Sequence, residues 1–138
     1  MSRKYLLNSF CLIIYCWVCV TEAFNIDQLY FDKIDDNGAI PDGVVTSIIQ
    51  DSQGFIWLGT MYGLIRYDGY EFRIFVNKSA DPRSLGGNYI KALCLSKDGK
   101  LWIGTSSDGV SVFDPSTNLF SNYDHSPSNP KSLSHSRI

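Results

Sequence analysis

The two histidines are the first candidates for chemistry, because imidazole commonly ligates metals and transfers protons. His125 and His135 lie ten positions apart in a segment rich in Ser, Pro and Asn. No Cys or carboxylate cluster accompanies them at the spacing of a metal site. We therefore interpret both as solvated loop residues, and the sequence predicts neither a metal nor a cofactor.

Carboxylates and arginines could support calcium binding or glycoside cleavage. Residues 35–38 read Asp-Asp-Asn-Gly, which begins like a Ca²⁺ loop, but the glutamate of the EF-hand pattern is absent. A polar turn is the favoured interpretation. A glycosidase needs an acid/base pair, and Arg66, Arg73 and Arg83 are too scattered to form a substrate-binding cluster beside one. We therefore expect no catalysis in this segment.

Tyr62 and Tyr70 lie beside predicted turns, and an exposed tyrosine there could stack on a ligand. The alternative, which we favour, is that both pack on neighbouring structural units, because tyrosine is often partly buried. The net charge of -2 predicts no basic surface for nucleic acid. With 44% hydrophobic and 19% charged residues, the composition is that of an ordinary globular protein.

The first 23 residues resemble a secretory signal peptide. Arg3 and Lys4 precede an uncharged run from Tyr5 to Thr21, and small residues at positions 21 and 23 suit cleavage before Phe24. An uncleaved anchor is the alternative, but 17 uncharged residues are short for a span of roughly 20. Three cysteines fall in this leader. Cys94 is the only one after it, so we expect no intrachain disulfide and interpret it as a small buried residue.

The elements that must position these residues are repeated. Residues 45–75 and 90–123 match at an offset of 45 and then 46, and residues 129–138 echo 81–90 at an offset of 48. A period near 48 built from short strands indicates a β-propeller blade or a related array. The matched residues of the two repeats are these: Asp51, Gly54, Trp57, Gly59, Thr60, Gly63, Tyr67 and Asp68 in the first, and Asp98, Gly99, Trp102, Gly104, Thr105, Gly109, Phe113 and Asp114 in the second.

Each repeat is predicted to be a four-stranded antiparallel meander, because short apolar runs alternate with Gly, Asp and Asn turns. The sequence thus predicts an all-β fold of about two blades of an incomplete propeller after a signal peptide. The expected strands are 45–50, 55–60, 64–67 and 71–75, then 90–95, 100–104, 110–113 and 119–123. The expected organisation is a signal peptide (1–23), an N-terminal segment with a possible blade-closing strand at 29–34 (24–44), repeat 1 (45–75), an inter-blade loop (76–89), repeat 2 (90–123), and a linker with the truncated start of repeat 3 (124–138).

Three expectations follow for single residues. Trp57 and Trp102 should both be buried between blades, each covering on the order of 200 Å². Gly59 and Gly104 lie inside strands, where glycine indicates a close approach of another segment. Asp51 and Asp98 should stabilise their own turns through side-chain-to-backbone hydrogen bonds, although Asp98 lies closer to its turn glycine than Asp51 does.

The segments QDSQGFIWLGTMYGLIRYDGYEFRIF and SKDGKLWIGTSSDGVSVFDPSTNLFSNY resemble the two-component regulator propeller repeats. The family pattern, D-x-x-G-x-[IL]-W-[IL]-G-T followed by G-[LV] and an aromatic-Asp pair, is matched twice in register, except that Asp98 lies closer to Gly99 than the pattern places its aspartate. The resemblance implies a periplasmic sensor region of a bacterial membrane-bound histidine kinase or diguanylate cyclase, whose effector would lie outside these residues. It also implies binding of a small molecule or carbohydrate, and partners among the other blades and signalling domains of a longer parent.

Two alternatives stay open at this point. The chain could belong to a secreted propeller enzyme, such as a lyase or a glycosidase. It could also be a truncated gene product without a function.

Overall fold

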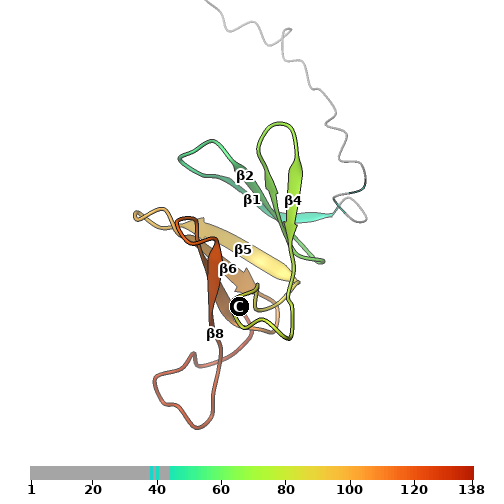
Figure 1. Cartoon of the computed structure of the whole chain (residues 1–138). Coiled ribbons are helices and arrows are strands. Elements are labelled where there is room, and N and C mark those ends of the chain that lie inside the picture. The colour runs from blue at the N-terminus through green and yellow to red at the C-terminus, as the bar shows by residue number, and fades with distance from the viewer. Residues whose placement is uncertain (1–37, 39, 41–43) are drawn as a thin grey trace, which may run out of the picture. The chain divides into compact units, whose positions relative to one another are not determined.

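The protein is described by a computed structural model in which residues 38, 40 and 44–138 are placed, and these residues form two four-stranded antiparallel sheets (Figure 1). Strand order follows chain order in each sheet. The expected leader, the possible strand at 29–34 and most of the N-terminal segment lie outside the described residues. The first sheet contains β1 (Val45–Gln50), β2 (Ile56–Thr60), β3 (Leu64–Tyr67) and β4 (Phe72–Phe75), and the second contains β5 (Ile90–Leu95), β6 (Leu101–Thr105), β7 (Val110–Asp114) and β8 (Leu119–Tyr123).

The expected all-β arrangement is confirmed, with small differences at strand ends. β2 begins at Ile56 rather than Phe55, because the Phe55 carbonyl accepts a hydrogen bond of 3.0 Å from Asp51 N and so closes the turn. The Lys100 carbonyl does the same for Ser96 N at 2.9 Å, and β6 accordingly begins at Leu101. Turn hydrogen bonding therefore trims the strands that hydrophobicity predicts.

The two sheets share one irregularity, in the first strand of each. The β1–β2 register shifts between Val45 and Ser47, and the β5–β6 register shifts between Ile90 and Ala92. A bulge of this kind re-aims the extra side chain. In the first sheet that side chain is Thr46, whose hydroxyl donates to the Ile90 carbonyl at 2.8 Å. The bulge thus joins the first strands of the two sheets by a hydrogen bond.

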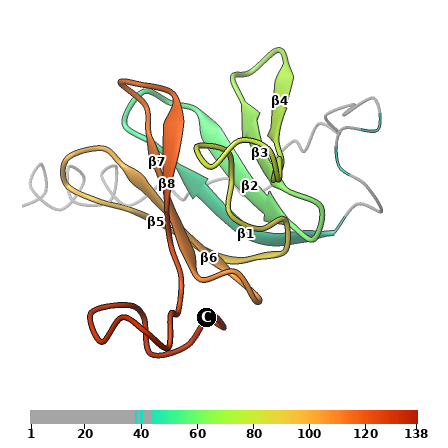
Figure 2. The ribbon, with the colours of Figure 1, turned by 60° about the horizontal axis from the view of Figure 1, so that its bottom comes forward.

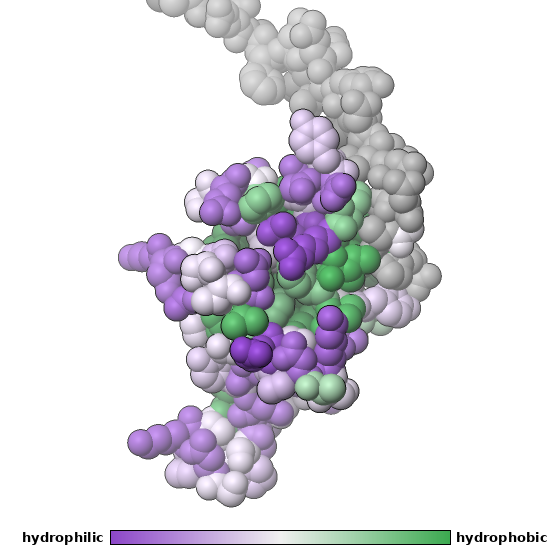
Figure 3. Space-filling model, viewed as in Figure 1, coloured by the Kyte–Doolittle hydropathy of each residue, from purple (hydrophilic) through white to green (hydrophobic). Residues whose placement is uncertain are grey.

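The core lies between the facing sides of the two sheets (Figure 2). The first sheet contributes Trp57, with its ring 5.2 Å from that of Phe113 in the second sheet. Phe75 of β4 lies 5.5 Å from Phe113 and 5.7 Å from Phe120. Offset and edge contacts at these distances are favourable for aromatic pairs. Figure 3 shows hydrophobic residues in the middle of one face and hydrophilic ones on the projecting hairpins. The remaining buried members of the cluster are Leu64, Leu85, Ile90, Leu101 and Ile103.

The prediction of buried tryptophans is confirmed for Trp57 and wrong for Trp102. Trp57 is 2% exposed, whereas Trp102 is 45% exposed. Trp57 faces the second sheet, but Trp102 stands on the side of the second sheet that is turned away from the first. Cys94 is the cross-strand neighbour of Trp102 and is also exposed, so the interpretation of Cys94 as a buried residue is wrong for the same reason.

Candidate functional site

The turn before β2 is organised by one carboxylate. Asp51 Oδ1 accepts hydrogen bonds from Gln53 N at 2.9 Å and from Phe55 N at 3.0 Å, and Oδ2 accepts one from Trp57 Nε1 at 2.8 Å. Gly54 closes this turn with φ of 92°, a conformation that glycine adopts without steric cost. The expectation for Asp51 is confirmed, and the same group also satisfies the buried indole N–H.

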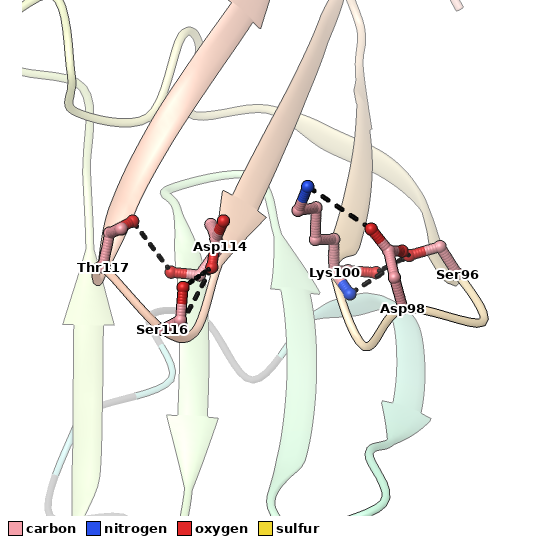
Figure 4. Close-up of polar contacts among 6 residues, drawn as sticks. All are labelled: Ser96, Asp98, Lys100, Asp114, Ser116 and Thr117. Atoms are coloured by element: carbon pink, nitrogen blue, oxygen red, sulfur yellow. Dashed lines mark hydrogen bonds and ion pairs between the residues drawn. The ribbon is translucent and has the colours of Figure 1, made fainter.

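The corresponding turn of the second sheet works differently (Figure 4). Ser96 stands where Asp51 stands in the first repeat, and its hydroxyl accepts from Lys100 N at 3.1 Å and contacts Lys100 O at 2.9 Å. Asp98 accepts a short hydrogen bond from Ser96 Oγ and pairs with Lys100 Nζ at 3.3 Å. The prediction that Asp98 binds its own turn backbone is therefore wrong. Ser96 carries that role through its bonds to the Lys100 backbone.

The motif threonines and the glycines after them build the β2–β3 and β6–β7 turns. Thr60 Oγ1 donates to Gly63 O at 2.8 Å and accepts from Tyr62 N at 3.0 Å. Thr105 Oγ1 makes the equivalent bonds, to Gly109 O at 2.9 Å and from Asp108 N at 2.9 Å. Both hydroxyls are buried, so these bonds satisfy polar groups that would otherwise be costly to bury.

Gly59 and Gly104 are confirmed as points of close approach. A Cβ on Gly59 would lie 2.7 Å from Ile90 Cγ2, and a Cβ on Gly104 would lie 2.9 Å from Ile138 Cγ2. Ile90 and Ile138 are 48 residues apart, as the repeat predicts. Residues 129–138 therefore begin the same contact with the second sheet that residues 81–90 make with the first.

Asp68 and Asp114 close the outer hairpins of the two sheets. Asp68 Oδ1 accepts from Tyr70 N at 2.9 Å and from Glu71 N at 2.8 Å, and Asp114 Oδ1 accepts from Ser116 N at 2.9 Å (Figure 4). The backbone N–H groups of Glu71 and Tyr70 lower the pKa of Asp68. The hydroxyl and N–H of Ser116 lower the pKa of Asp114, because hydrogen bonds to a carboxylate favour its charged form.

The neighbouring aromatic positions differ between the sheets. Tyr67 stacks on Phe72 at 4.5 Å, on the side of the first sheet away from the second. Phe113 is 1% exposed in the core between the sheets.

The loop from Val76 to Tyr89 is held by Asn77 and Ser84. Asn77 Nδ2 donates to Leu85 O and Gly86 O, both at 2.8 Å. Ser84 Oγ accepts from Lys78 N at 2.9 Å and donates to Asp81 O at 2.7 Å. The serine belongs to the Pro-Arg/Lys-Ser-Leu segment shared with residues 130–133, and that recurrence was the signal of a structural role.

The second loop reproduces this geometry and gives His125 a function. Ser132 Oγ accepts from Ser126 N at 2.9 Å and donates to Asn129 O at 2.8 Å. His125 occupies the place of Asn77, and its Nδ1 lies 2.7 Å from Leu133 O. Because a carbonyl only accepts, Nδ1 carries the proton in this contact. His125 and His135 are exposed, as expected for solvated loop residues, and their rings lie 6.5 Å apart. His125 also fastens the loop through its contact with Leu133 O.

These loops, with the β2–β3 and β6–β7 turns, form one end of the sheets, called here the loop end. Ser106 N donates to Tyr89 O at 2.8 Å and Gly109 N donates to Ser136 O at 2.7 Å, which joins turns to loops. Tyr62 stands at this end and is 49% exposed. Tyr70 stands at the opposite end and is 93% exposed, so the interpretation of Tyr70 as a packed turn residue is wrong.

Two features of the described residues bear on function. Among residues 38, 40 and 44–138, no group of three His, Cys, Asp or Glu side chains could hold a metal ion. Within the same residues there is no helix long and apolar enough to cross a bilayer. The motif residues form two hairpin frameworks, and the exposed polar and aromatic groups of the loop end are candidates for ligand contact.

Comparison with known proteins agrees with this architecture. The model of the family described as "Two component regulator propeller" matches residues 39–62 and 84–107. A curated relative, "Histidine kinase P4" of Formosa agariphila, is 29% identical over 79 residues, which cover 57% of this chain and 6% of that protein. The chain thus spans only a small part of the curated relative it matches.

Solved structures show the same fold. The extracellular domain of a hybrid two component system, BT3049 from B. thetaiotaomicron, matches with a TM-score of 0.69 and 28% identity over 77% of this chain and 15% of that one. The extracellular domain of BT4673 from the same organism matches with a TM-score of 0.51 and 24% identity over 69% of this chain and 14% of that one, which bears on the fold alone. The two sheets are blades of a β-propeller, and each contains a segment that matches the two-component regulator propeller family.

Proposed function

We propose that residues 24–138 are part of the periplasmic propeller sensor of a membrane-anchored bacterial signalling protein. The observation that carries the proposal is the similarity, over 77% of this chain, to the extracellular domain of a hybrid two component system. The two in-register hairpin frameworks support it, because sheets of this kind stack face to face as the blades of a propeller. The effector, a histidine kinase or a diguanylate cyclase, would belong to a longer parent protein.

The ligand surface that we propose is the loop end. Tyr62 offers a half-exposed aromatic face, and the Asp108 carboxylate of the neighbouring β6–β7 turn is exposed. An aromatic face with a few polar groups around it is the usual composition of a small-molecule site. A carbohydrate is the ligand class that we propose. Its binding would act on the signalling protein by favouring one packing of its domains over another.

Thermal unfolding across a panel of glycans and small metabolites tests this proposal. A ligand of the loop end should raise the unfolding temperature through mass action. Replacing Tyr62 by Ala should abolish that rise, whereas Tyr70→Ala, at the opposite end, should preserve it. A panel with no stabilising compound would remove the support for ligand sensing. A rise that depends on Tyr70 rather than Tyr62 would contradict the placement of the site.

A further inference from the structure

The loop from Val76 to Tyr89 is fastened to the second sheet by two polar side chains. Asn122 Nδ2 donates to Pro82 O at 3.1 Å and to Ser84 O at 2.9 Å. Ser111 Oγ donates to Asn122 Oδ1 at 2.7 Å and accepts from Gly86 N at 3.0 Å. The Ser111–Asn122 latch, as we call this pair, therefore satisfies two carbonyls and one N–H of the loop with complementary groups.

A backbone contact completes the seat of the loop. Phe120 N donates to Arg83 O at 3.0 Å, so the loop runs along the end of β8. Leu85, between the latch contacts, is 0% exposed within the inter-sheet core. The latch thus sets how the second sheet meets the loop that leads into it, at the rim of an apolar interface.

The loop after β8 has the same internal structure without a partner of this kind. Ser132 N donates to Asn129 O at 3.0 Å, as Ser84 N donates to Asp81 O at 3.0 Å. Lys131 N donates to Asn129 Oδ1 at 3.0 Å, as Arg83 N donates to Asp81 Oδ1 at 3.0 Å. The first loop docks through backbone groups that correspond to the carbonyls of residues 130–132 and the N–H of residue 134 in the second loop. Within the described part of the chain, no hydrogen bond is made to these groups of the second loop.

The sheet surface below that second loop also matches the first interface. The outer face of the second sheet presents Trp102, Val110 and Tyr123 where the first sheet has Trp57, Leu64 and Phe75. In the first sheet these residues pack against the rings of Phe113 and Phe120. On the second sheet, Trp102 is 45% and Tyr123 52% exposed, and with the loop they line a hollow of about 390 Å³. This surface continues an interface that the chain already makes once.

The blades of a propeller pack one on the next. Resting on the propeller function proposed above, we infer that the outer face of the second sheet, with residues 126–138 above it, selects as the following repeat of the same polypeptide one that carries a Ser–Asn latch. The first sheet could not supply that latch. Ile65 and Ile74 stand at its corresponding positions, so the carbonyls and N–H of the loop would meet apolar side chains there. Burying those polar groups without partners is unfavourable. This selectivity distinguishes a following repeat from the first sheet of a second copy of the chain.

Chains extended beyond Ile138 test the inference. One extension copies residues 91–138, latch included, with the copied cysteine replaced by Ala. A matched one changes only the two copied latch residues, to Ile. The readout is the rate at which N-ethylmaleimide modifies Cys94, followed on its own peptide by mass spectrometry, with sedimentation to report the oligomeric state. Cys94 and Trp102 share the face in question, so docking should protect both.

We expect Cys94 to react rapidly in the unextended monomer and at least tenfold more slowly in the chain with the latch-bearing extension. In the chain whose copied latch is changed to Ile, Cys94 should react several-fold faster than in the latch-bearing chain. The Trp102 emission should shift to shorter wavelength in the protected chain only. Equal protection by both extensions would overturn the latch. No protection by either extension would overturn the docking surface. Protection of Cys94 in unextended dimers would show that a second copy covers the face and would also contradict the inference.

Discussion

The Ile90 side chain occupies the space that a Cβ on Gly59 would need, with its Cγ2 atom 2.7 Å from that position. Ile90 is 0% exposed, so it has no free direction in which to move. Gly59 thus allows the first strand of one blade to lie against the second strand of the preceding blade. The hydrogen bond from Thr46 to the Ile90 carbonyl fixes the same approach from the β1 side.

Replacing Gly59 by Ala should therefore destabilise the protein by about 1–3 kcal/mol, the usual range for overpacking. Gly104→Ala is the matched control. Its added methyl group meets Ile138, which is 50% exposed and can shift, so we expect a smaller effect. Urea unfolding followed by tryptophan fluorescence measures both. Equal costs at the two glycines would contradict the importance of the buried Ile90.

The turns before β2 and β6 are held by different hydrogen bonds, so their aspartates should differ in how much they contribute to stability. Asp51→Ala removes the acceptor of Trp57 Nε1 and of two backbone N–H groups, and we expect a loss of about 1–3 kcal/mol. Asp98→Ala should have a much smaller effect, because the Asp98 side chain is exposed and its ion pair with Lys100 lies at the surface. In urea unfolding, Ser96→Ala should destabilise the protein more than Asp98→Ala does. The reverse order would show that Asp98, not Ser96, organises the second turn.

The glycine that ends the β6–β7 turn should be the least replaceable of the turn glycines. Gly109 has φ of 68°, and a Cβ there would lie 2.2 Å from the Tyr123 carbonyl oxygen, a backbone atom. We expect Gly109→Ala to cost about 2–4 kcal/mol, within the range of substitutions that strain the backbone. Gly99→Ala shares the positive φ but meets nothing within 4 Å, so strain alone should cost about 1–2 kcal/mol. Comparable unfolding midpoints for the two variants would disprove the steric argument.

Acid should weaken the outer hairpin of the first sheet and the loop after β8. Hydrogen bonds lower the pKa of Asp68, through Glu71 and Tyr70 N–H, and that of Asp124, through the Ser136 hydroxyl and His125 N–H. A carboxylate with a lowered pKa contributes stability that is present above its unfolded pKa of about 3.9 and is lost as the pH falls through the lower folded value. The urea midpoint should therefore be level near neutral pH and fall below pH 4.

The Asp68→Asn variant is the control for this pH dependence. It should have a flatter profile below pH 4 than the parent protein, while the profile near neutral pH stays level. An unchanged acid slope would mean that Asp68 does not contribute to it.

Export depends on residues 1–23 if they act as a signal peptide. Alkaline phosphatase is active only after export, so a fusion after Ile138 should be active in cells. Deleting residues 2–23 should abolish that activity, and N-terminal sequencing of the exported product should begin at Phe24. A product that begins at Met1 would instead support the uncleaved anchor.

The sequence by itself determined the elements that depend on near neighbours. The repeat of Gly, Trp, Gly and Thr predicted the eight strands of the described residues to within about one residue, and the sequence identified Asp51 and Asp68 as turn residues. The resemblance of the two segments also identified the family correctly. Such features are predictable because turn hydrogen bonds and positive φ values act over three or four residues.

Tertiary structure alone decided what each face meets. Trp57 and Trp102 occupy the same motif position, yet one is buried and the other is exposed, because only the first has a sheet packed against it. The sequence did not predict that Ser111 and Asn122 fasten the loop, because isoleucines stand at their places in the first repeat and the repeat pattern does not include them. Burial and long-range hydrogen bonding depend on segments that are distant in sequence, and a local pattern does not specify which segment will pack where.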